Sequence, residues 1–325
     1  MVPWLPFPAA LLGAVATTWV VTAWLRRRAI LDHPNDRSSH AVPTPRGGGW
    51  GILLVLLPGW AALGVAPPVL AAVIGLAAVS WLDDRRGLPP GPRLLAQTVA
   101  VLAGLGTLGG DVLVFQGWLP WALDRAGAAL CWLWFINLFN FMDGIDGLAG
   151  TEAAMVAAGL ALAASVAGLA GPLVTPALVL AGAALGFLVW NWQPAKVFMG
   201  DVGSIPVGFA LGWLLLSAAG AGLWPAALLL PLYFLTDATL TLLRRLAAGQ
   251  RIWQAHREHF YQRAVQSGRS HAWVVATVLT ANLGLVTLAT LAPALGWPVL
   301  VGGAVVVTVL LWRLHCAAPP RETPL

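Results

Sequence analysis

Apolar runs of about 16 to 22 residues recur along almost the whole chain and are separated by short polar segments. Because about 20 apolar residues cross the hydrocarbon core of a bilayer as one helix, this spacing predicts an all-α, polytopic integral membrane protein. No repeat, linker or low-complexity segment interrupts the pattern, so residues 1–325 are expected to form one membrane-embedded domain. About eleven transmembrane helices are expected, close to residues 4–25, 48–65, 67–82, 94–110, 126–142, 149–168, 172–190, 204–222, 224–243, 272–291 and 296–312.

Composition changes this interpretation little and excludes a soluble protein. Hydrophobic residues make up 59% of the chain and charged residues only 10%, whereas a soluble domain needs about 25% charged residues to cover its surface. Cys131 and Cys316 lie in or beside apolar segments, so no disulfide framework is expected.

The basic residues predict the orientation. With the N-terminus outside, Arg125 alone among the 18 Lys and Arg residues falls in an outer segment, as the positive-inside rule requires. The net charge of +5 then follows from topology and anionic lipid headgroups, and no nucleic-acid partner is expected.

The acidic residues and histidines gather on the same inner side. Asp111 and Asp124 belong to the outer loop, and the remaining carboxylates fall in inner loops or at the inner ends of spans. No ionisable residue sits clearly at a midplane, where a pump or ion-coupled transporter keeps its working charges. The candidate chemistry lies in five inner segments: 32–51, 81–93, 132–150, 191–204 and 244–271.

Asp83 and Asp84 form the first candidate. Adjacent carboxylates repel unless a divalent cation or neighbouring arginines neutralise them, and hard oxygen ligands suit Mg²⁺. The alternative is a solvated helix end paired with Arg85 and Arg86.

The stretch WLWFINLFNFMDGIDGLAG, residues 132–150, is the second candidate. Asn137, Asn140 and Asp143 recur every three residues and so share one helix face, and Asp146 follows where glycines allow the helix to end. Polar contacts between helices are the alternative explanation.

Three further acidic residues lie at or near the inner ends of predicted spans. In FMGDVGS, glycines flanking Asp201 allow close backbone approach to a phosphate or metal, and Ser204 is expected to cap the next span. Asp237 is expected to pair with Arg244, and Glu152 to be a first-turn acid favoured by the helix dipole.

His256, Arg257 and His259 mark the fifth segment. Two histidines three residues apart lack a third zinc ligand at suitable spacing, so a cation-rich segment that binds phosphate is preferred. An amphipathic helix lying on the membrane is the alternative.

The motifs DD, NFMDGIDGLAG, FMGDVGS and HREHF, in this order over residues 32–271, resemble those of the polyprenyl-phosphate N-acetylhexosamine-1-phosphate transferases of glycosyltransferase family 4. That family includes phospho-N-acetylmuramoyl-pentapeptide transferase and the UDP-GlcNAc:undecaprenyl-phosphate GlcNAc-1-phosphate transferase. The resemblance implies transfer of a sugar 1-phosphate from a UDP-sugar to undecaprenyl phosphate at the bilayer, with release of UMP and with Mg²⁺ or Mn²⁺ as cofactor.

Carried over by motif, the resemblance implies metal contacts for Asn140 and Asp201. Asp83, Asp84, His256 and His259 would be catalytic. The expected substrate-binding residues are His40, Arg46, Asp143, Asp146, Asn191, Phe198 and Arg257.

Departures from the family pattern indicate a subgroup. SSHAVPTPRGGG stands where muramoyl-pentapeptide enzymes have T-P-T-M-G-G, and HREHF replaces their run of histidines. The similarity is greater to initiators of O-antigen and other cell-envelope polysaccharides in the bacterial inner membrane, which implies a HexNAc donor. A muramoyl-pentapeptide transferase, a lipid-linked sugar transporter and a homodimeric assembly remain open.

Overall fold

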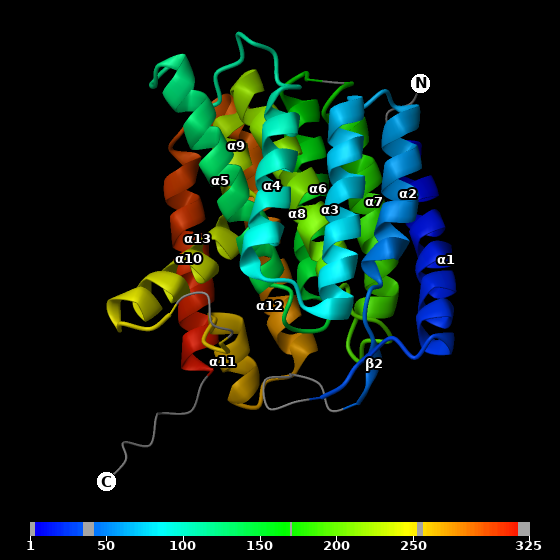
Figure 1. Ribbon diagram of the computed structural model, residues 1–325. Helices are drawn as coiled ribbons and strands as arrows, with labels where there is room; N and C mark the ends of the chain where they lie inside the picture. Colours follow the sequence, from blue (N-terminus) through cyan, green and yellow to red (C-terminus); the bar gives the residue numbers. More distant parts are fainter. Residues whose placement is uncertain (1–3, 35–41, 170, 252–255, 318–325) are drawn as a thin grey trace.

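The computed structural model describes residues 4–34, 42–169, 171–251 and 256–317. These residues form a bundle of helices, and one antiparallel pair of two-residue strands lies at its lower end (Figure 1). The elements are α1 (Pro6–Arg27), β1 (Leu31–Asp32), β2 (Thr44–Pro45), α2 (Gly49–Ala62), α3 (Pro67–Arg86), α4 (Pro90–Leu105), α5 (Trp121–Phe141), α6 (Leu148–Val166), α7 (Val174–Asn191), α8 (Asp201–Ala218), η1 (Ala219–Leu223), α9 (Trp224–Leu229), α10 (Leu232–Ala247), α11 (Phe260–Gln266), α12 (His271–Leu295) and α13 (Val299–Cys316).

The predicted class is confirmed, since the chain is a polytopic helical membrane protein. Within the described part of the chain, seven helical stretches are long and apolar enough to cross a membrane. Every expected span coincides with helix, although α2 and α4, at 14 and 16 residues, are shorter than those seven stretches. The count of eleven and the orientation stay predictions.

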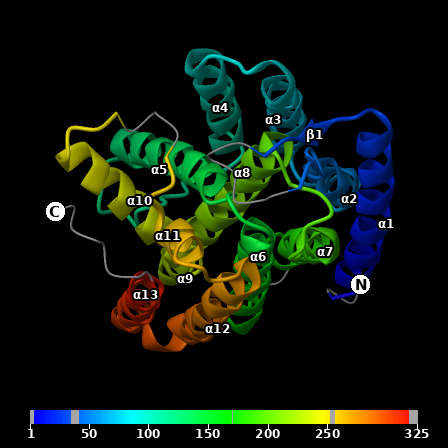
Figure 2. The ribbon, with the colours of Figure 1, turned by 90° about the horizontal axis from the view of Figure 1, so that it is seen from below.

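One expected span, 224–243, is wrong as a single helix. The chain breaks at Leu230 and Pro231, because a proline in a helix interior removes a backbone donor and clashes with the preceding turn. The break separates α9 from α10. Seen from below, α10 points outward beside α5, and its basic C-terminal end stands clear of the bundle (Figure 2).

Glycines set the closest helix contacts. A Cβ on Gly182 would lie 2.5 Å from the carbonyl oxygen of Phe7, and one on Gly186 would lie 2.4 Å from that of Leu11. This small-xxx-small spacing lets α7 and α1 touch backbone to backbone, the usual basis of tight packing between apolar helices in a bilayer.

Trp132 packs α5 into the centre. Its ring lies between α4 and α8, where a Cβ on Gly104 or Gly212 would stand only 2.3 Å from ring atoms. Its indole nitrogen donates to Phe209 O at 3.0 Å, which satisfies the buried donor. The central helix α8 is therefore locked to the helix that carries the asparagines.

Polar residues meet at the lower end of Figure 1, which we call the polar end. It comprises the described residues within 26–50, 81–93, 140–149, 191–203 and 244–273. The five segments singled out from the sequence all contribute to it.

Candidate active site

The segments PTPRGGG and KVFMGD lie side by side at the polar end. Phe198 N donates to Pro45 O at 2.8 Å, and Gly48 N donates back to Phe198 O at 2.8 Å. A Cβ on Gly49 would lie 2.1 Å from the Cα of Gly203, so α2 and α8 begin in direct backbone contact. Two motifs about 150 residues apart thereby form one loop cluster, with Arg46 next to Phe198.

Arg46 joins two carboxylates. Its Nη2 lies 2.9 Å from Asp84 Oδ1 and 3.0 Å from Asp201 Oδ1, while Nη1 lies 3.8 Å from Asp32 Oδ2. Burial works to lower the pKa of Arg46, but Asp84, Asp201, Asp32 and Asp143 together raise it above its usual range. The guanidinium is therefore held as a permanent cation among four acids.

Asp84 also closes the start of α8. Its carboxylate accepts hydrogen bonds from Asp201 N at 3.2 Å and Val202 N at 3.0 Å, which are free donors of the first turn. A residue at the end of α3 therefore accepts hydrogen bonds from the first turn of α8, and the alternative of a solvated helix end paired with Arg85 and Arg86 is wrong for Asp84.

Asp83 points to a different neighbour. It accepts from Leu88 N at 2.6 Å and pairs with Arg93 Nε at 3.1 Å, and these contacts close the turn between α3 and α4. The two aspartates therefore brace two different helices. Of Asp83 and Asp84, it is Asp84 that pairs with Arg46.

The asparagines of α5 also divide. Asn140 Oδ1 accepts from Ser204 Oγ at 2.6 Å and so faces α8, whereas Asn137 donates to Gln97 of α4 at 2.7 Å. The alternative of a polar contact between helices is therefore confirmed for both asparagines, and a metal contact of Asn140 stays a prediction. The expectation that Ser204 caps α8 is wrong, because the cap position is Gly200, with φ of +72°.

Asp143 lies in the loop just after α5 and within electrostatic reach of the Arg46 cluster. Burial raises its pKa well above the usual range, as do Asp201 and Asp84, whereas Arg46 opposes the shift. We call Arg46, Asp84, Asn140, Asp143 and Asp201 the acidic cluster.

Asp146 and Asn191 are buried and engaged in scaffold contacts. Asp146 accepts from Ala195 N at 3.0 Å and lies 3.3 Å from His271 Nδ1. Asn191 accepts from Gly147 N at 3.0 Å and donates to Val197 O at 2.9 Å. They join the DGIDG loop to the loop before α8. Their expected contact with substrate stays a prediction.

Asp237 is the acid that the sequence interpretation placed wrongly. It does not pair with Arg244, which stacks on Phe260 at 4.8 Å. Its fully buried carboxylate instead accepts from Phe260 N at 3.0 Å and lies 3.3 Å from the His259 ring. Asp237 thus fixes α11 and His259 against α10.

Tyr261 joins this histidine segment to the DGIDG loop. Its hydroxyl donates to Phe141 O at 3.1 Å, and a Cβ on Gly144 would lie 2.1 Å from the hydroxyl oxygen. Burial raises the pKa of Tyr261, as do Asp237 and Asp143, so the phenol stays protonated as a donor. This contact could not be predicted, because nothing in the sequence relates Tyr261 to Gly144.

The histidine segment is a loop followed by the short helix α11. The alternative of one amphipathic helix is therefore wrong for its described part. The rings of His256 and His259 lie 4.9 Å apart. Burial, then His259 and Arg245, lowers the pKa of His256 to about 4, so the ring is neutral near pH 7. Arg257 lies in the same loop, close enough to Tyr261 to lower its pKa.

His40 and Glu152 differ from the residues above in what the structure shows of them. His40 lies outside the described residues. Glu152 is one turn inside α6, not in its first turn as expected, and its buried carboxylate accepts from Asn282 of α12 at 2.7 Å.

The acidic cluster fits a hard divalent cation by its donor chemistry. No three His, Cys, Asp or Glu side chains form a ready metal cage in the described ranges. However, Mg²⁺ commonly uses one or two carboxylates together with substrate phosphates. Asp84 and Asp201 already hold one cationic group between them, and the amide oxygen of Asn140 contacts Ser204, one turn after Asp201 in α8.

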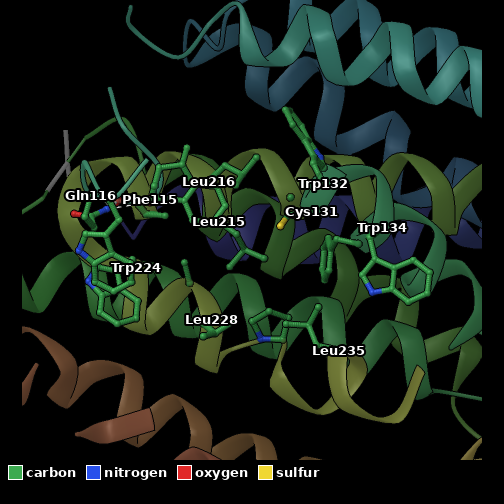
Figure 3. Close-up of a pocket in the computed structure, with 17 residues that line it drawn as sticks. Phe115, Gln116, Cys131, Trp132, Trp134, Leu215, Leu216, Trp224, Leu228 and Leu235 are labelled. Atoms are coloured by element: carbon green, nitrogen blue, oxygen red, sulfur yellow. Dashed lines mark hydrogen bonds between the residues drawn. The ribbon is translucent and has the colours of Figure 1, made fainter. Parts of the chain in front are cut away.

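An apolar groove of about 370 Å³ opens along α5, α8 and α9 (Figure 3). Its walls are leucines and aromatic rings, with Cys131 and Trp134 on α5, Leu216 on α8 and Leu228 on α9. Phe135, which also lines it, lies about 7.5 Å along α5 from Asn140 at about 1.5 Å per residue. Phe115 and Gln116, in the loop before α5, line its other part, so the groove extends from that loop along α5 as far as Phe135.

Comparison with known proteins points to the same family as the sequence motifs. Residues 66–219 match the profile of glycosyl transferase family 4. A decaprenyl-phosphate N-acetylglucosaminephosphotransferase of Mycobacterium tuberculosis strain H37Rv is 30% identical over 83% of this chain and 78% of its own length. A probable undecaprenyl-phosphate N-acetylglucosaminyl 1-phosphate transferase of Bacillus subtilis is 27% identical over 83% and 80%.

A phospho-N-acetylmuramoyl-pentapeptide-transferase of Synechococcus sp. strain JA-3-3Ab is 37% identical over 67% of this chain and 68% of its own length. The resemblance inferred from the motifs is thereby confirmed. The chain belongs to glycosyl transferase family 4.

Proposed function

We propose that this protein transfers an N-acetylhexosamine 1-phosphate from a UDP-sugar to undecaprenyl phosphate and releases UMP. The observation that carries the proposal is the acidic cluster, in which Arg46 joins Asp84 and Asp201 at the polar end of a membrane bundle. The named transferase relatives support the same reaction class.

The reaction brings two polyanions together, so the site must neutralise negative charge. Bound Mg²⁺ would supply charge neutralisation at the diphosphate, with Asp201, Asp84 and Asn140 as its protein ligands. Arg46 and Arg257 would attract phosphate oxygens by their charge, and a neutral His256 can donate a hydrogen bond to them. The amide of Asn140 adds an oxygen ligand without adding charge that would repel the diphosphate.

The acceptor is a lipid, and its tail needs an apolar path. The groove along α5, α8 and α9 offers that path, and Phe135 is its lining residue on α5 that lies nearest to Asn140 in the chain. A polyprenyl chain in this groove would stay out of water while its phosphate reaches the acidic cluster.

The finer assignment follows the sequence departures. We infer a HexNAc donor, an orientation with the polar end in the cytoplasm of a bacterium, and a product that begins O-antigen or another cell-envelope polysaccharide. The muramoyl-pentapeptide donor is the second candidate, because the Synechococcus relative has the higher identity of 37%.

The test is UMP release from purified protein with undecaprenyl phosphate and Mg²⁺. UDP-GlcNAc, UDP-GalNAc and UDP-MurNAc-pentapeptide are compared as donors, with Asp201→Asn as the control variant. We expect release with a UDP-HexNAc that requires lipid, metal and Asp201. Release only with the pentapeptide donor would move the chain to the second candidate. No release from any donor by folded protein would favour a transporter of lipid-linked sugars.

A further inference from the structure

We propose that Arg46 is the resident counter-ion of Asp84 and Asp201, and that a divalent cation reaches these carboxylates by displacing the Arg46 guanidinium. The inference rests on the proposed function, since it concerns how that site takes up its metal. It assigns to Arg46 a positioning role that precedes any contact with substrate.

The contact geometry makes Arg46 and a bridging metal exclusive. One nitrogen, Nη2, contacts Oδ1 of both Asp84 and Asp201, at 2.9 and 3.0 Å. The other oxygen of Asp84 accepts from the backbone of Val202 at 3.0 Å. A cation that bridges the two carboxylates therefore needs the positions that Nη2 holds, and two like charges cannot share them.

The Arg46 side chain is free to leave while its backbone is held. Arg46 N donates to Ile30 O at 3.3 Å, and Phe198 N donates to the carbonyl of the preceding Pro45 at 2.8 Å. The side chain is 38% exposed, compared with 4% for that of Asp84. Displacement therefore requires rotation of a long, partly solvated side chain and no movement of α8.

The surroundings also provide room and a second acceptor. A Cβ on Gly200 would lie 3.0 Å from Asp84 Oδ2 and 3.3 Å from Arg46 Cγ, so only glycine leaves this space open. Asp32, in β1, already lies 3.8 Å from Nη1. A displaced guanidinium can therefore turn to Asp32, which keeps its charge at the polar end.

Metal binding without substrate tests the competition. Mn²⁺ is titrated into detergent-purified wild-type protein, Arg46→Gln, Arg46→Lys and Arg93→Gln, and free Mn²⁺ is measured by electron paramagnetic resonance. Arg93→Gln is the matched control. Arg93 also carries a positive charge close enough to act on Asp201, but its side chain pairs with Asp83. We expect Arg46→Gln to bind Mn²⁺ about tenfold more tightly than wild type, Arg93→Gln to change less, and Arg46→Lys to fall between.

Equal tightening in Arg46→Gln and Arg93→Gln would overturn the proposal, because it would reflect only the loss of a nearby charge. Unchanged or weaker binding in Arg46→Gln would overturn it too. If Arg46→Gln does not fold, wild-type protein provides the test through labelling of Arg46 by phenylglyoxal, read by mass spectrometry. We expect Mg²⁺ to increase this labelling, and an unchanged or lower yield contradicts displacement.

The outcomes separate this inference from the proposed function. If Mn²⁺ binds wild type but not Asp201→Asn, the metal site stands, and the effect of Arg46 is judged on its own. If wild type binds no Mn²⁺ at the acidic cluster, the metal-dependent part of the proposed function fails together with the inference. Both results come from metal binding alone and do not depend on UMP release.

Discussion

At the scale of the residue, buried carboxylates at the polar end each connect two parts of the fold. Asp84 joins the end of α3 to the start of α8 and to Arg46. Asp237 joins α10 to α11 and to His259. Removing one such group leaves an arginine, a histidine or backbone donors without their acceptor, which is more costly than losing an exposed ion pair.

Asp84→Asn should therefore harm the protein more than Asp83→Asn. The Asp84 change removes the charge that holds Arg46 and weakens the cap of α8, so we expect activity to fall by about 100-fold or more. It should also lower the melting temperature, because Arg46 loses a 2.9 Å partner. UMP release and differential scanning fluorimetry measure both effects. A larger loss of melting temperature and of activity in Asp83→Asn would contradict these assignments.

His256 predicts a dependence of stability on pH. Its pKa is lowered to about 4 in the folded protein, whereas an unfolded histidine titrates near 6.5. Between these values the unfolded state binds more protons, so acidification from about pH 6.5 toward 4 destabilises the fold. We expect His256→Gln to lose less melting temperature than wild type between about pH 7.5 and 5.0. An equal or greater loss in the variant would show that His256 does not contribute.

At the scale of the element, helix ends at the polar end depend on glycines that let backbones touch. The starts of α2 and α8 meet at Gly49 and Gly203. The glycines of RGGGWG and FMGDVGS thus bring Arg46 and Asp201 together through the fold. Contact with phosphate is not needed to explain Gly49 and Gly203.

Gly49→Ala should separate α2 from α8. A Cβ at this position would lie 2.1 Å from the Cα of Gly203, and backbone cannot yield as a flexible side chain can. We expect a lower melting temperature and reduced Mn²⁺ binding, because Arg46 and Asp201 move apart. Gly75→Ala in α3 is the control, since nothing lies within 4 Å and alanine favours helix. Comparable behaviour of the two variants would refute the backbone contact.

The sequence predicted the helices well because each span needs about 20 apolar residues to cross the hydrocarbon core, which is a strong local constraint. The break between α9 and α10 could not be predicted, because the sequence shows only a continuous apolar run that contains Pro231. The motifs named every residue of the acidic cluster, which comprises Arg46, Asp84, Asn140, Asp143 and Asp201. The partners of Asp237 and Tyr261 depend on tertiary contacts between segments distant in the chain, and no local pattern encodes them.

At the scale of the whole molecule, the bundle has a charged cluster at its polar end and an apolar groove along α5, α8 and α9. The central helix α8 carries Asp201 at its start and Leu216 near its other end, so it contributes to both. A site with these two parts suits an acceptor that is phosphate at one end and hydrocarbon at the other.

Filling the groove should impair use of the lipid acceptor selectively. Leu216→Trp adds bulk to the groove wall, so we expect the KM for undecaprenyl phosphate to rise about tenfold while the KM for the UDP-sugar stays unchanged. Leu94→Trp on the exposed side of α4 is the control. Steady-state kinetics with both substrates measure this, and an equal rise in the two KM values would contradict a role for the groove in lipid binding.

The proposed reaction moves a sugar 1-phosphate, and not the sugar alone, to the lipid phosphate. It is best followed with UDP-GlcNAc labelled with ³²P in the phosphate next to the sugar, together with undecaprenyl phosphate, Mg²⁺ and purified protein. We predict that the label enters the butanol-extractable lipid, that unlabelled UMP is released, and that Asp201→Asn abolishes both. Label that stays in water-soluble UDP while the sugar enters the lipid would mean transfer of the sugar alone, and it would contradict the proposed reaction.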